Sequence, residues 1–334
     1  MTTPFVLSRA RELVEPSLRK AIGSLHPHLR MPVEYHFGWA DVDGSPLTGT
    51  SGKAVRPALA VLGAEAVGGD GEQAVPGATA LELIHNFSLI HDDIIDGDRL
   101  RRHRRTVWDV YGVGDAMVIG DSLHTLAFQV VLEDGGSRSV AAARRLSAAT
   151  MTMITGQAQD TALDRASEVT LDACLEMERN KTGALLAHSV AIGAVLAGAD
   201  DDVVEPLERY GAELGVTFQA IDDVLGSWGD PEVTGKPASS DLREHKKSMP
   251  VALALGMGGS LAAEVRDAFG GEMTDDVVAR LAGRLDEAGI RTQVEAVAWS
   301  HLDAACAALG ERSFVRAAAA ELEELAHFVV ARRH

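Results

Sequence analysis

The chain has 334 residues, of which 46% are hydrophobic, and it carries a formal net charge of −18 at pH 7. A charge of that sign and size argues against nucleic-acid binding, because the protein as a whole would repel a phosphate backbone. We recognise no signal peptide and no apolar run that would span a bilayer, and two cysteines are too few for a disulfide framework, so we expect a cytoplasmic protein.

Helical periodicity runs through the whole chain, and strand-like alternation is nearly absent. No linker or low-complexity tract divides residues 1–334, which predicts one large all-α domain. Residues 26–52 and 227–248 are rich in Gly, Pro and Asp and are predicted to be the long loops. Helices are predicted at 4–24, 54–67, 73–96, 115–132, 138–163, 169–180, 182–198 and 203–226, with several shorter ones after 249.

An acidic cluster ends the predicted helix at 73–96. At about 100° per residue, Asp92 and Asp96 fall on the same face as Leu81, Ile84 and His85, and that apolar face should point inward. An ionised carboxylate in such a place costs several kcal/mol unless a cation or hydrogen-bond donors face it. The helix dipole disfavours negative charge at this end as well, so the pattern indicates a bound divalent cation.

The simplest alternative is a solvated helix end whose acids are neutralised by the basic run at 99–105. The apolar residues before the cluster leave almost no solvated face, which favours a buried helix. A second cluster, Gln219, Asp222 and Asp223, lies on the apolar helix predicted at 203–226. Two inward-facing acidic helices can share Mg²⁺ with a phosphate ligand, since Mg²⁺ prefers a few carboxylates plus substrate oxygens. No Cys/His pattern suggests zinc.

Basic residues at helix ends and in loops complete this pattern. Arg binds phosphate oxygens bidentately and Lys acts as a point charge, so such residues around two metal-binding faces suit one or two diphosphates. A nucleotide-binding P-loop is excluded, because Ala54 stands where that loop needs Ser or Thr. The basic residues are Lys53, Arg56, Arg101, Arg102, Lys181, Lys236, Lys246 and Lys247.

Short motifs in a fixed order extend this interpretation to most of the chain. From about Leu13 to the C terminus, the sequence resembles a trans-isoprenyl diphosphate synthase of the polyprenyl synthetase family. The resemblance implies the isoprenoid synthase type I fold, a helical bundle around a central apolar cavity, and a homodimer. The matching segments are SGKAVRP (51–57), ELIHNFSLIHDDIID (82–96), LRR (100–102), GQAQD (156–160), KTG (181–183), FQAIDD (218–223), GDPEVTGKP (229–237) and DLREHKKS (241–248).

The resemblance also implies roles for single residues. Three Mg²⁺ ions would bind with the diphosphate, two of them held by Asp92 and Asp96 with Asp93 in support. Asp222, beside Asp223, would hold the third. Isopentenyl diphosphate would be bound by Lys53, Arg56, His85 and Arg102. The allylic diphosphate would be contacted by Arg101, Lys181, Lys236 and Lys246. The reacting centre would be lined by Gln157, Asp160, Thr182 and Gln219.

The reaction that the resemblance implies is head-to-tail condensation of isopentenyl diphosphate with an allylic diphosphate. Metal ions and basic side chains would stabilise charge on the departing diphosphate, so that the carbon–oxygen bond ionises to an allylic cation. The double bond of isopentenyl diphosphate would attack this cation, and a proton would then be lost. No protein nucleophile is required, and the sequence shows no Ser/His/Asp or Cys/His constellation that would supply one.

Product length should be limited by the floor of the cavity. Each added isoprene unit buries about five carbons at roughly 0.8 kcal/mol per CH₂, so elongation would continue without a steric stop. Phe87 lies five residues before Asp92, roughly 7.5 Å back along the helix axis, and its neighbour Ser88 is small. This pair resembles short-chain members of the family and favours a C20 product over C15. Phe87 could instead be an ordinary core residue.

Three departures from the family pattern leave alternatives open. The second acidic motif ends in Gly226 where family members carry a third Asp, and bulky residues replace the usual Gly and Pro after Arg102. Ser51 and Ala54 also depart from the common pattern. A class I terpene cyclase shares the architecture, but the set of Lys53, Arg56 and His85 would be redundant with only one diphosphate. A non-catalytic partner subunit of a synthase is a second alternative, which the intact acids disfavour.

Overall fold

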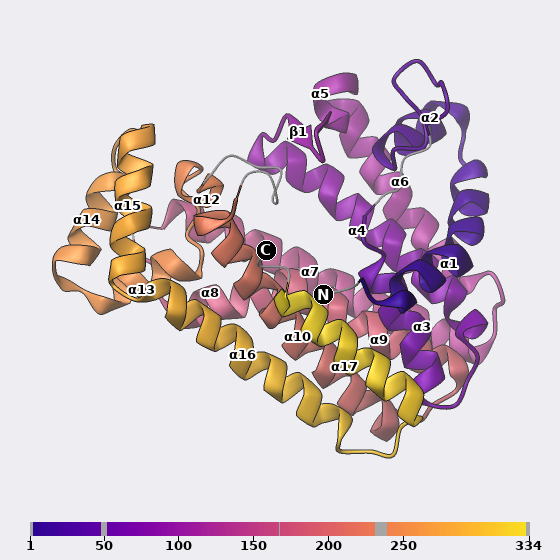
Figure 1. The fold of residues 1–334 in the computed structure, drawn as a ribbon. Coiled ribbons are helices and arrows are strands. Elements are labelled where there is room, and N and C mark those ends of the chain that lie inside the picture. The colour runs from indigo at the N-terminus through magenta and orange to yellow at the C-terminus, as the bar shows by residue number, and fades with distance from the viewer. Residues whose placement is uncertain (1–2, 48–51, 167, 231–238, 332–334) are drawn as a thin grey trace.

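The computed structural model describes residues 3–47, 52–166, 168–230 and 239–331, and long helices make up most of it (Figure 1). Helix α9 lies in the middle of the bundle and contacts α3, α7 and α10. Helix α4 packs on α6, and α10 packs on α16. Helices α14 and α15 lie on the left of the view, where α14 packs on α13 and α15 contacts α16.

The first half of the chain forms α1 Phe5–Gly23, α2 Pro27–His36, α3 Val55–Ala66, η1 Gly71–Ala74, α4 Val75–Asp96, β1 Leu100–Arg101, β2 Arg104–Arg105, α5 Val107–Tyr111, α6 Val113–Leu132 and α7 Ser137–Arg165. The second half forms α8 Leu171–Glu178, η2 Arg179–Gly183, α9 Ala184–Ala197, α10 Asp201–Trp228, α12 Ser240–Arg243, α13 Met249–Met257, α14 Gly259–Phe269, α15 Asp275–Glu287, α16 Ile290–Leu309 and α17 Arg316–Ala331.

Helix α9 forms the centre of the core because it is apolar around its whole circumference and almost entirely buried. Its contact with α3 is made at backbone distance. A Cβ added to Gly193 would lie 2.8 Å from the carbonyl carbon of Ala60, and one on Gly63 would lie 2.9 Å from that of Val190. Both added Cβ atoms would lie closer still to the carbonyl oxygens of these two residues. Glycine is therefore required where these two helices cross.

The all-α prediction is confirmed, and each predicted helix corresponds to a helix of the structure with ends shifted by a few residues. The prediction of a loop over 26–52 is wrong in its first part, where α2 forms. Pro27 occupies the first turn of α2, where a proline has no hydrogen bond to lose, and the His26 ring accepts a hydrogen bond from the amide of His28. Residues 231–238 of the second predicted loop lie outside the described residues.

Two residues each from β1 and β2 pair in an antiparallel hairpin, with Leu100 opposite Arg105. Within the ranges described, no helix is both long and apolar enough to cross a membrane.

His188 of α9 gives the fold a testable pH dependence. The residue is 3% exposed, and its Nε2 atom has no hydrogen-bond partner. Burial, assisted by the charge of Arg145, lowers its pKa from 6.5 to about 3. An unfolded chain takes up this proton below about pH 6.5, but the folded chain resists protonation down to about 3. The resulting stability is present at neutral pH and is lost as the pH falls through this window.

We expect the free energy of unfolding to fall as the pH is lowered from 6.5, with His188 contributing up to about 1.4 kcal/mol per pH unit. His188→Gln should reduce the number of protons taken up on unfolding by about one. The dependence of the unfolding free energy on pH, measured by urea unfolding between pH 7 and pH 4, should then be less steep. Substitution of the exposed His327 by Gln is the matched control and should leave the slope unchanged. An unaltered slope in His188→Gln would contradict the assignment.

Candidate functional site

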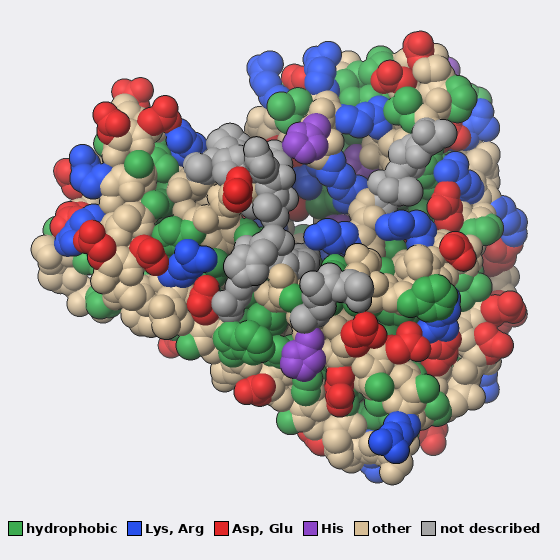
Figure 2. Space-filling model, viewed as in Figure 1, with side chains coloured by type: hydrophobic (Ala, Val, Ile, Leu, Met, Phe, Trp, Pro, Cys, Tyr) green, Lys and Arg blue, Asp and Glu red, His purple; other side chains and the backbone are tan. Residues whose placement is uncertain are grey.

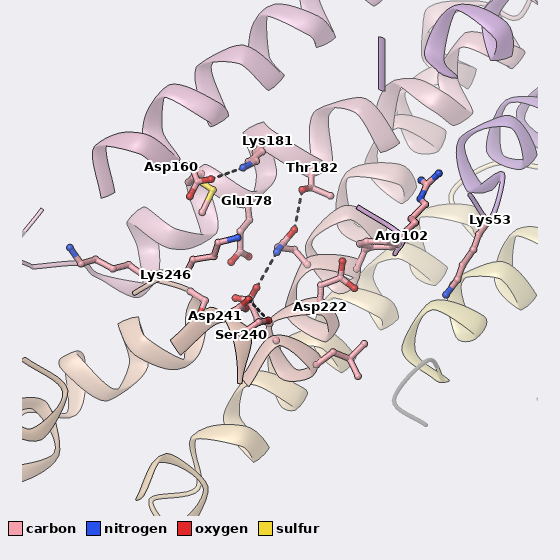
Figure 3. A pocket seen from close by; sticks show the side chains of 18 residues that line it. Lys53, Arg102, Asp160, Glu178, Lys181, Thr182, Asp222, Ser240, Asp241 and Lys246 are labelled. Atoms are coloured by element: carbon pink, nitrogen blue, oxygen red, sulfur yellow. Dashed lines mark hydrogen bonds and ion pairs between the residues drawn. The ribbon is translucent and has the colours of Figure 1, made fainter. Parts of the chain in front are cut away.

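A cavity of about 600 Å³ opens between α10, α7, η2 and α12 (Figure 3). Lys53 and Arg102 lie on one side of it and Asp160 and Lys246 on the other, with Asp222 between them. Lys and Arg side chains also gather around the hollow on the face seen in Figure 2. The lining residues are Lys53, Arg102, Asp160, Met177, Glu178, Lys181, Thr182, Phe218, Gln219, Asp222, Asp223, Leu225, Gly226, Ser240, Asp241, Lys246, Lys247 and Ser248.

The cavity differs from the expected apolar one, because most of its lining is charged or polar. Met177, Phe218 and Leu225 are its large apolar side chains. The two residues predicted to limit product length, Phe87 and Ser88, are not part of this lining. The described cavity therefore has the chemistry of a site for anions and cations, and not that of a hydrocarbon channel.

Lys181 and Thr182 enter the cavity from η2, a single π-helical turn between α8 and α9. Such turns insert one extra residue into a helix and re-aim its side chains. Glycines in the two neighbouring helices admit this turn. A Cβ on Gly156 of α7 would lie 2.7 Å from the carbonyl carbon of Asn180, and one on Gly215 of α10 would lie 3.1 Å from the amide nitrogen of Gly183.

Lys181 is the cation that faces the acids of α4. Its ammonium forms an ion pair with Asp160 at 2.5 Å. Burial opposes the charged form, but the charges of Asp92, Asp160 and Asp96 outweigh burial and raise the pKa of Lys181 above its usual value. Burial raises the pKa of Asp92 to about 6, even though Lys181 acts in the opposite direction. The structure therefore brings the predicted residues Asp92, Asp96, Asp160 and Lys181 into one electrostatic unit.

Asp93 and Arg101 are engaged with each other. The carboxylate Oδ1 of Asp93 accepts a hydrogen bond from Nε of Arg101 at 2.7 Å. Asp93 is buried, and its Oδ2 has no partner. Arg101 is placed by the hairpin, whose turn residues Arg102 and His103 take the left-handed φ values of 51° and 63°. Such φ values favour glycine and cost about 1 kcal/mol or more for other residues. The hairpin therefore forms with Arg and His in its turn, at the expense of backbone strain, and β1 and β2 stay paired.

A second group of cations surrounds His85 on α4. Arg56 is partly buried, its Nε has no hydrogen-bond partner, and burial lowers its pKa to about 10 despite the nearby charge of Glu82. Burial and the charges of Arg56 and Arg102 hold the pKa of His85 well below 6.5, so its ring is neutral at pH 7. An unsatisfied guanidinium nitrogen in a cluster of positive charge favours an anionic ligand.

Three side chains of α10 and η2 form a hydrogen-bonded chain across the cavity. Thr182 donates to Oε1 of Gln219 at 3.1 Å, and Nε2 of Gln219 donates to Oδ1 of Asp223 at 3.0 Å. The second oxygen of Asp223 accepts from the amide of Met249 at 2.8 Å. Both Asp223 oxygens thus bond within the protein, and this carboxylate orients Gln219, whereas Asp222 is directed into the cavity (Figure 3).

The remaining predicted residues are accounted for as follows. Gln157 has a buried Oε1 without a hydrogen-bond partner. Lys236 lies outside the described residues. Glu178, Ser240 and Asp241 also line the cavity, and the sequence pattern did not single them out. Asp241 opens the segment DLREHKKS, in which only the basic residues Lys246 and Lys247 were predicted to act.

The donor set of the site fits magnesium. In the ranges that the structure describes, no three His, Cys, Asp or Glu side chains stand close enough to hold an ion by themselves. The available donors are oxygens, and two buried oxygens of the lining, Oε2 of Glu178 and Oγ of Ser248, have no protein partner. Mg²⁺ fits this donor set, because it binds through one or two carboxylates and completes its shell with waters and substrate phosphates.

Acids from facing helices and a surround of cations on one cavity define an all-α protein with a site for metal ions and anionic ligands. Residues 45–282 match the polyprenyl synthetase family. The chain is 44% identical over 333 residues to a (2E,6E)-farnesyl diphosphate synthase of Mycobacterium tuberculosis, covering 98% of this chain and 93% of the relative. It is 42% identical over 308 residues to a geranylgeranyl diphosphate synthase of the same organism, covering 91% and 88%.

Solved structures agree with these relatives. A polyprenyl synthetase from Streptomyces coelicolor superposes with a TM-score of 0.94 at 45% identity, covering 98% of this chain and 99% of that one. A geranylgeranyl pyrophosphate synthase from Corynebacterium glutamicum, solved with isoprenyl diphosphate and magnesium, has a TM-score of 0.83 at 25% identity over 100% of both chains. This chain therefore belongs to the polyprenyl synthetase family. The predicted resemblance is confirmed, and neither alternative, cyclase or non-catalytic subunit, is favoured.

The ion pair between Asp93 and Arg101 supplies a prediction about stability. Arg101→Ala should lower the free energy of unfolding by about 3 kcal/mol, because it leaves a buried carboxylate without its cation. Urea unfolding at pH 7 measures this loss. Adding Asp93→Asn to that variant removes the buried charge and should restore part of the stability. Equal stabilities of Arg101→Ala and the parent protein would refute a structural role for the pair.

Proposed function

We propose that this protein is a magnesium-dependent prenyltransferase that condenses isopentenyl diphosphate with an allylic diphosphate to a short-chain, all-trans prenyl diphosphate. The observation that carries the proposal is the convergence of Asp160, Lys181 and Asp222 on one cavity. Asp92 on α4 interacts electrostatically with Lys181, and a cationic group surrounds Arg56. The farnesyl and geranylgeranyl synthases among its relatives support the same reaction.

The two groups of cations suit two different diphosphates. Arg56, His85 and Arg102, together with Lys53, would bind isopentenyl diphosphate. Lys181 and Lys246 would bind the allylic diphosphate on the acidic side of the cavity, with Arg101 and Lys236 in the same role. A fixed cation near the departing diphosphate stabilises charge as the carbon–oxygen bond breaks. The predicted contact of Arg101 competes with its ion pair to Asp93.

Magnesium ions bound with the diphosphate would neutralise its negative charge and make it a better leaving group. We assign Asp92 and Asp96 to two ions and Asp222 to a third, with Asp93 and Asp223 in support. Thr182 and Gln219 would line the reacting centre with Gln157 and Asp160, and Asp223 fixes the orientation of the Gln219 amide.

The remaining steps need no nucleophile from the protein. The π electrons of isopentenyl diphosphate form the new carbon–carbon bond to the allylic cation. A proton then leaves the adjacent carbon and is taken up by the released diphosphate, which restores the double bond. The protein's part is to hold both substrates in line and to exclude water from the cation.

Asp92→Asn tests the metal assignment. We expect turnover with Mg²⁺, isopentenyl diphosphate and farnesyl or geranyl diphosphate to fall by at least about three orders of magnitude, the scale of losing a key electrostatic stabiliser. The fold should persist, because the change removes charge and keeps shape. Radiolabelled product formation and thermal melting measure the two effects. Normal turnover in this variant would remove Asp92 from the metal site.

Phe87 supports a short-chain product. Its ring makes edge-on contacts with His91 of α4 and His124 of α6, at centroid distances of 4.9 and 5.2 Å. These contacts hold the ring in place five residues before Asp92. We propose that a product chain growing along α4 would end against it. We propose C20 as the main product, with C15 as the other short-chain product considered.

Phe87→Ala is expected to lengthen the product by one or more C5 units, because it removes the steric stop. Chromatography of the dephosphorylated alcohols resolves the product lengths. Phe128→Ala is the matched control, since the Phe128 ring contacts His124 on the same helix. This variant should leave the product unchanged. An unaltered distribution in Phe87→Ala would show that the stop lies elsewhere.

The predicted homodimer and cytoplasmic location also belong to this proposal. Helices α6 and α7 expose several large apolar side chains that a second copy would cover. They are Val113, Met117, Val118, Leu132, Val140, Met151 and Ile154.

A further inference from the structure

The hairpin of β1 and β2 carries Arg101 and Arg102, to which the proposed function gives two different diphosphates. Its turn is made by Arg102 and His103, and both residues have the left-handed φ that side chains disfavour. A two-stranded hairpin is at best marginally stable by itself. The direction of the two arginines therefore depends on contacts from outside the hairpin.

Arg104 fastens the second strand to the end of α2 and to the residues that follow it. In the strand pairing it lies directly opposite Arg101. Its Nη1 donates to the carbonyl oxygen of Tyr35 and its Nη2 donates to that of Ala40, both at 3.0 Å. Asp41 forms an ion pair with the same guanidinium at 3.7 Å. Because both ends of the planar fork bond to backbone oxygens, this side chain holds β2 at a fixed distance from residues 35–41.

Tyr35 adds a second contact between α2 and β2. The guanidinium carbon of Arg104 lies over its ring, 4.3 Å from the ring centre, which is within the range of a cation–π contact. The Tyr35 hydroxyl donates to the carbonyl oxygen of Arg105 at 2.7 Å, and the residue is 4% exposed. Each of the two side chains thus bonds to the backbone of the other's segment, so the contact between α2 and β2 is reciprocal.

The contact lies directly behind the proposed diphosphate site. Arg101, Arg102 and Arg104 line a small cavity together with Tyr35 and the buried Asp93. Arg102 also lines the main cavity. A shift of the hairpin relative to α2 would therefore displace Arg102 within the main cavity.

We propose that Arg104 is a positioning residue for prenyl transfer, which holds the hairpin against α2 and so fixes where Arg101 and Arg102 meet the two diphosphates. This role rests on the proposed function and deepens it, because it gives a task to the RRHRR segment, in which bulky residues replace the usual Gly and Pro. A proline would restrict the strand through its own φ. Here the contact of one side chain with α2 supplies the restriction.

The experiment is steady-state prenyl transfer with Mg²⁺, isopentenyl diphosphate and geranyl or farnesyl diphosphate. Arg104→Ala should lower kcat/KM for isopentenyl diphosphate by about 100-fold, the effect of misplacing a reactant by about 1 Å, and KM should rise. Arg105→Ala is the matched control, because it removes the same charge from the same strand. The Arg105 side chain is exposed and pairs with Asp109 of α5, so this variant should act like the parent protein.

Two further variants separate position from charge. Arg104→Lys keeps the charge but cannot bond both carbonyl oxygens with one planar group, so most of the loss should remain. Tyr35→Phe removes only the hydroxyl contact and should give a smaller loss in kcat/KM. Combined with Arg104→Ala it should add little, because both side chains hold the same strand. Thermal melting shows that each variant is folded at the assay temperature.

Several outcomes would contradict this role of Arg104. Unchanged kcat/KM in a folded Arg104→Ala variant would overturn the proposal. Full recovery in Arg104→Lys, or an equal loss in Arg105→Ala, would assign the effect to charge and would overturn it as well. If the parent protein forms no prenyl diphosphate, the proposed function itself fails and the role of Arg104 falls with it.

Discussion

The attraction between Asp92 and Asp96 on α4 and the ammonium of Lys181 is the interaction on which the site depends. Burial raises the pKa of Asp92 to about 6, and the charges of Asp92, Asp160 and Asp96 raise the pKa of Lys181 above its usual value against the effect of burial. Neither group would be tolerated alone in this environment. The acids and the ammonium stabilise each other's charged forms. Together they form a site that can bind metal cations and the anionic ligands of those cations.

The sequence predicted the helices and the acidic faces because both follow from local periodicity. Apolar spacing predicted α4 and α10, and the carboxylates on their stripes indicated an interior charge that needed a partner. The ordered motifs then predicted the family. Residues on these two helices were predictable because the pattern that buries Ile84 or Ile221 also fixes the direction of Asp92 or Asp222.

Other parts of the site depend on contacts between distant segments, which periodicity does not report. Asp241 and Gly226 are fifteen residues apart in the sequence, and their contact becomes visible only when α12 is placed on α10. The pairing of Asp93 with Arg101 requires the hairpin. The two-proline segment that forms α2 was predicted as a loop because proline marks loops and first helical turns alike.

The π turn η2 has a consequence for how α8 and α9 relate to each other. With its extra residue the turn shifts the phase of α9 relative to α8 by about 100° from that of an uninterrupted α-helix. Deleting one residue there would straighten the pair into a single regular rod. Either the side chains of α9 would then rotate out of the core or Lys181 would turn away from Asp160. The fold thus links the rotational position of the central helix α9 to the direction in which the ammonium of Lys181 points.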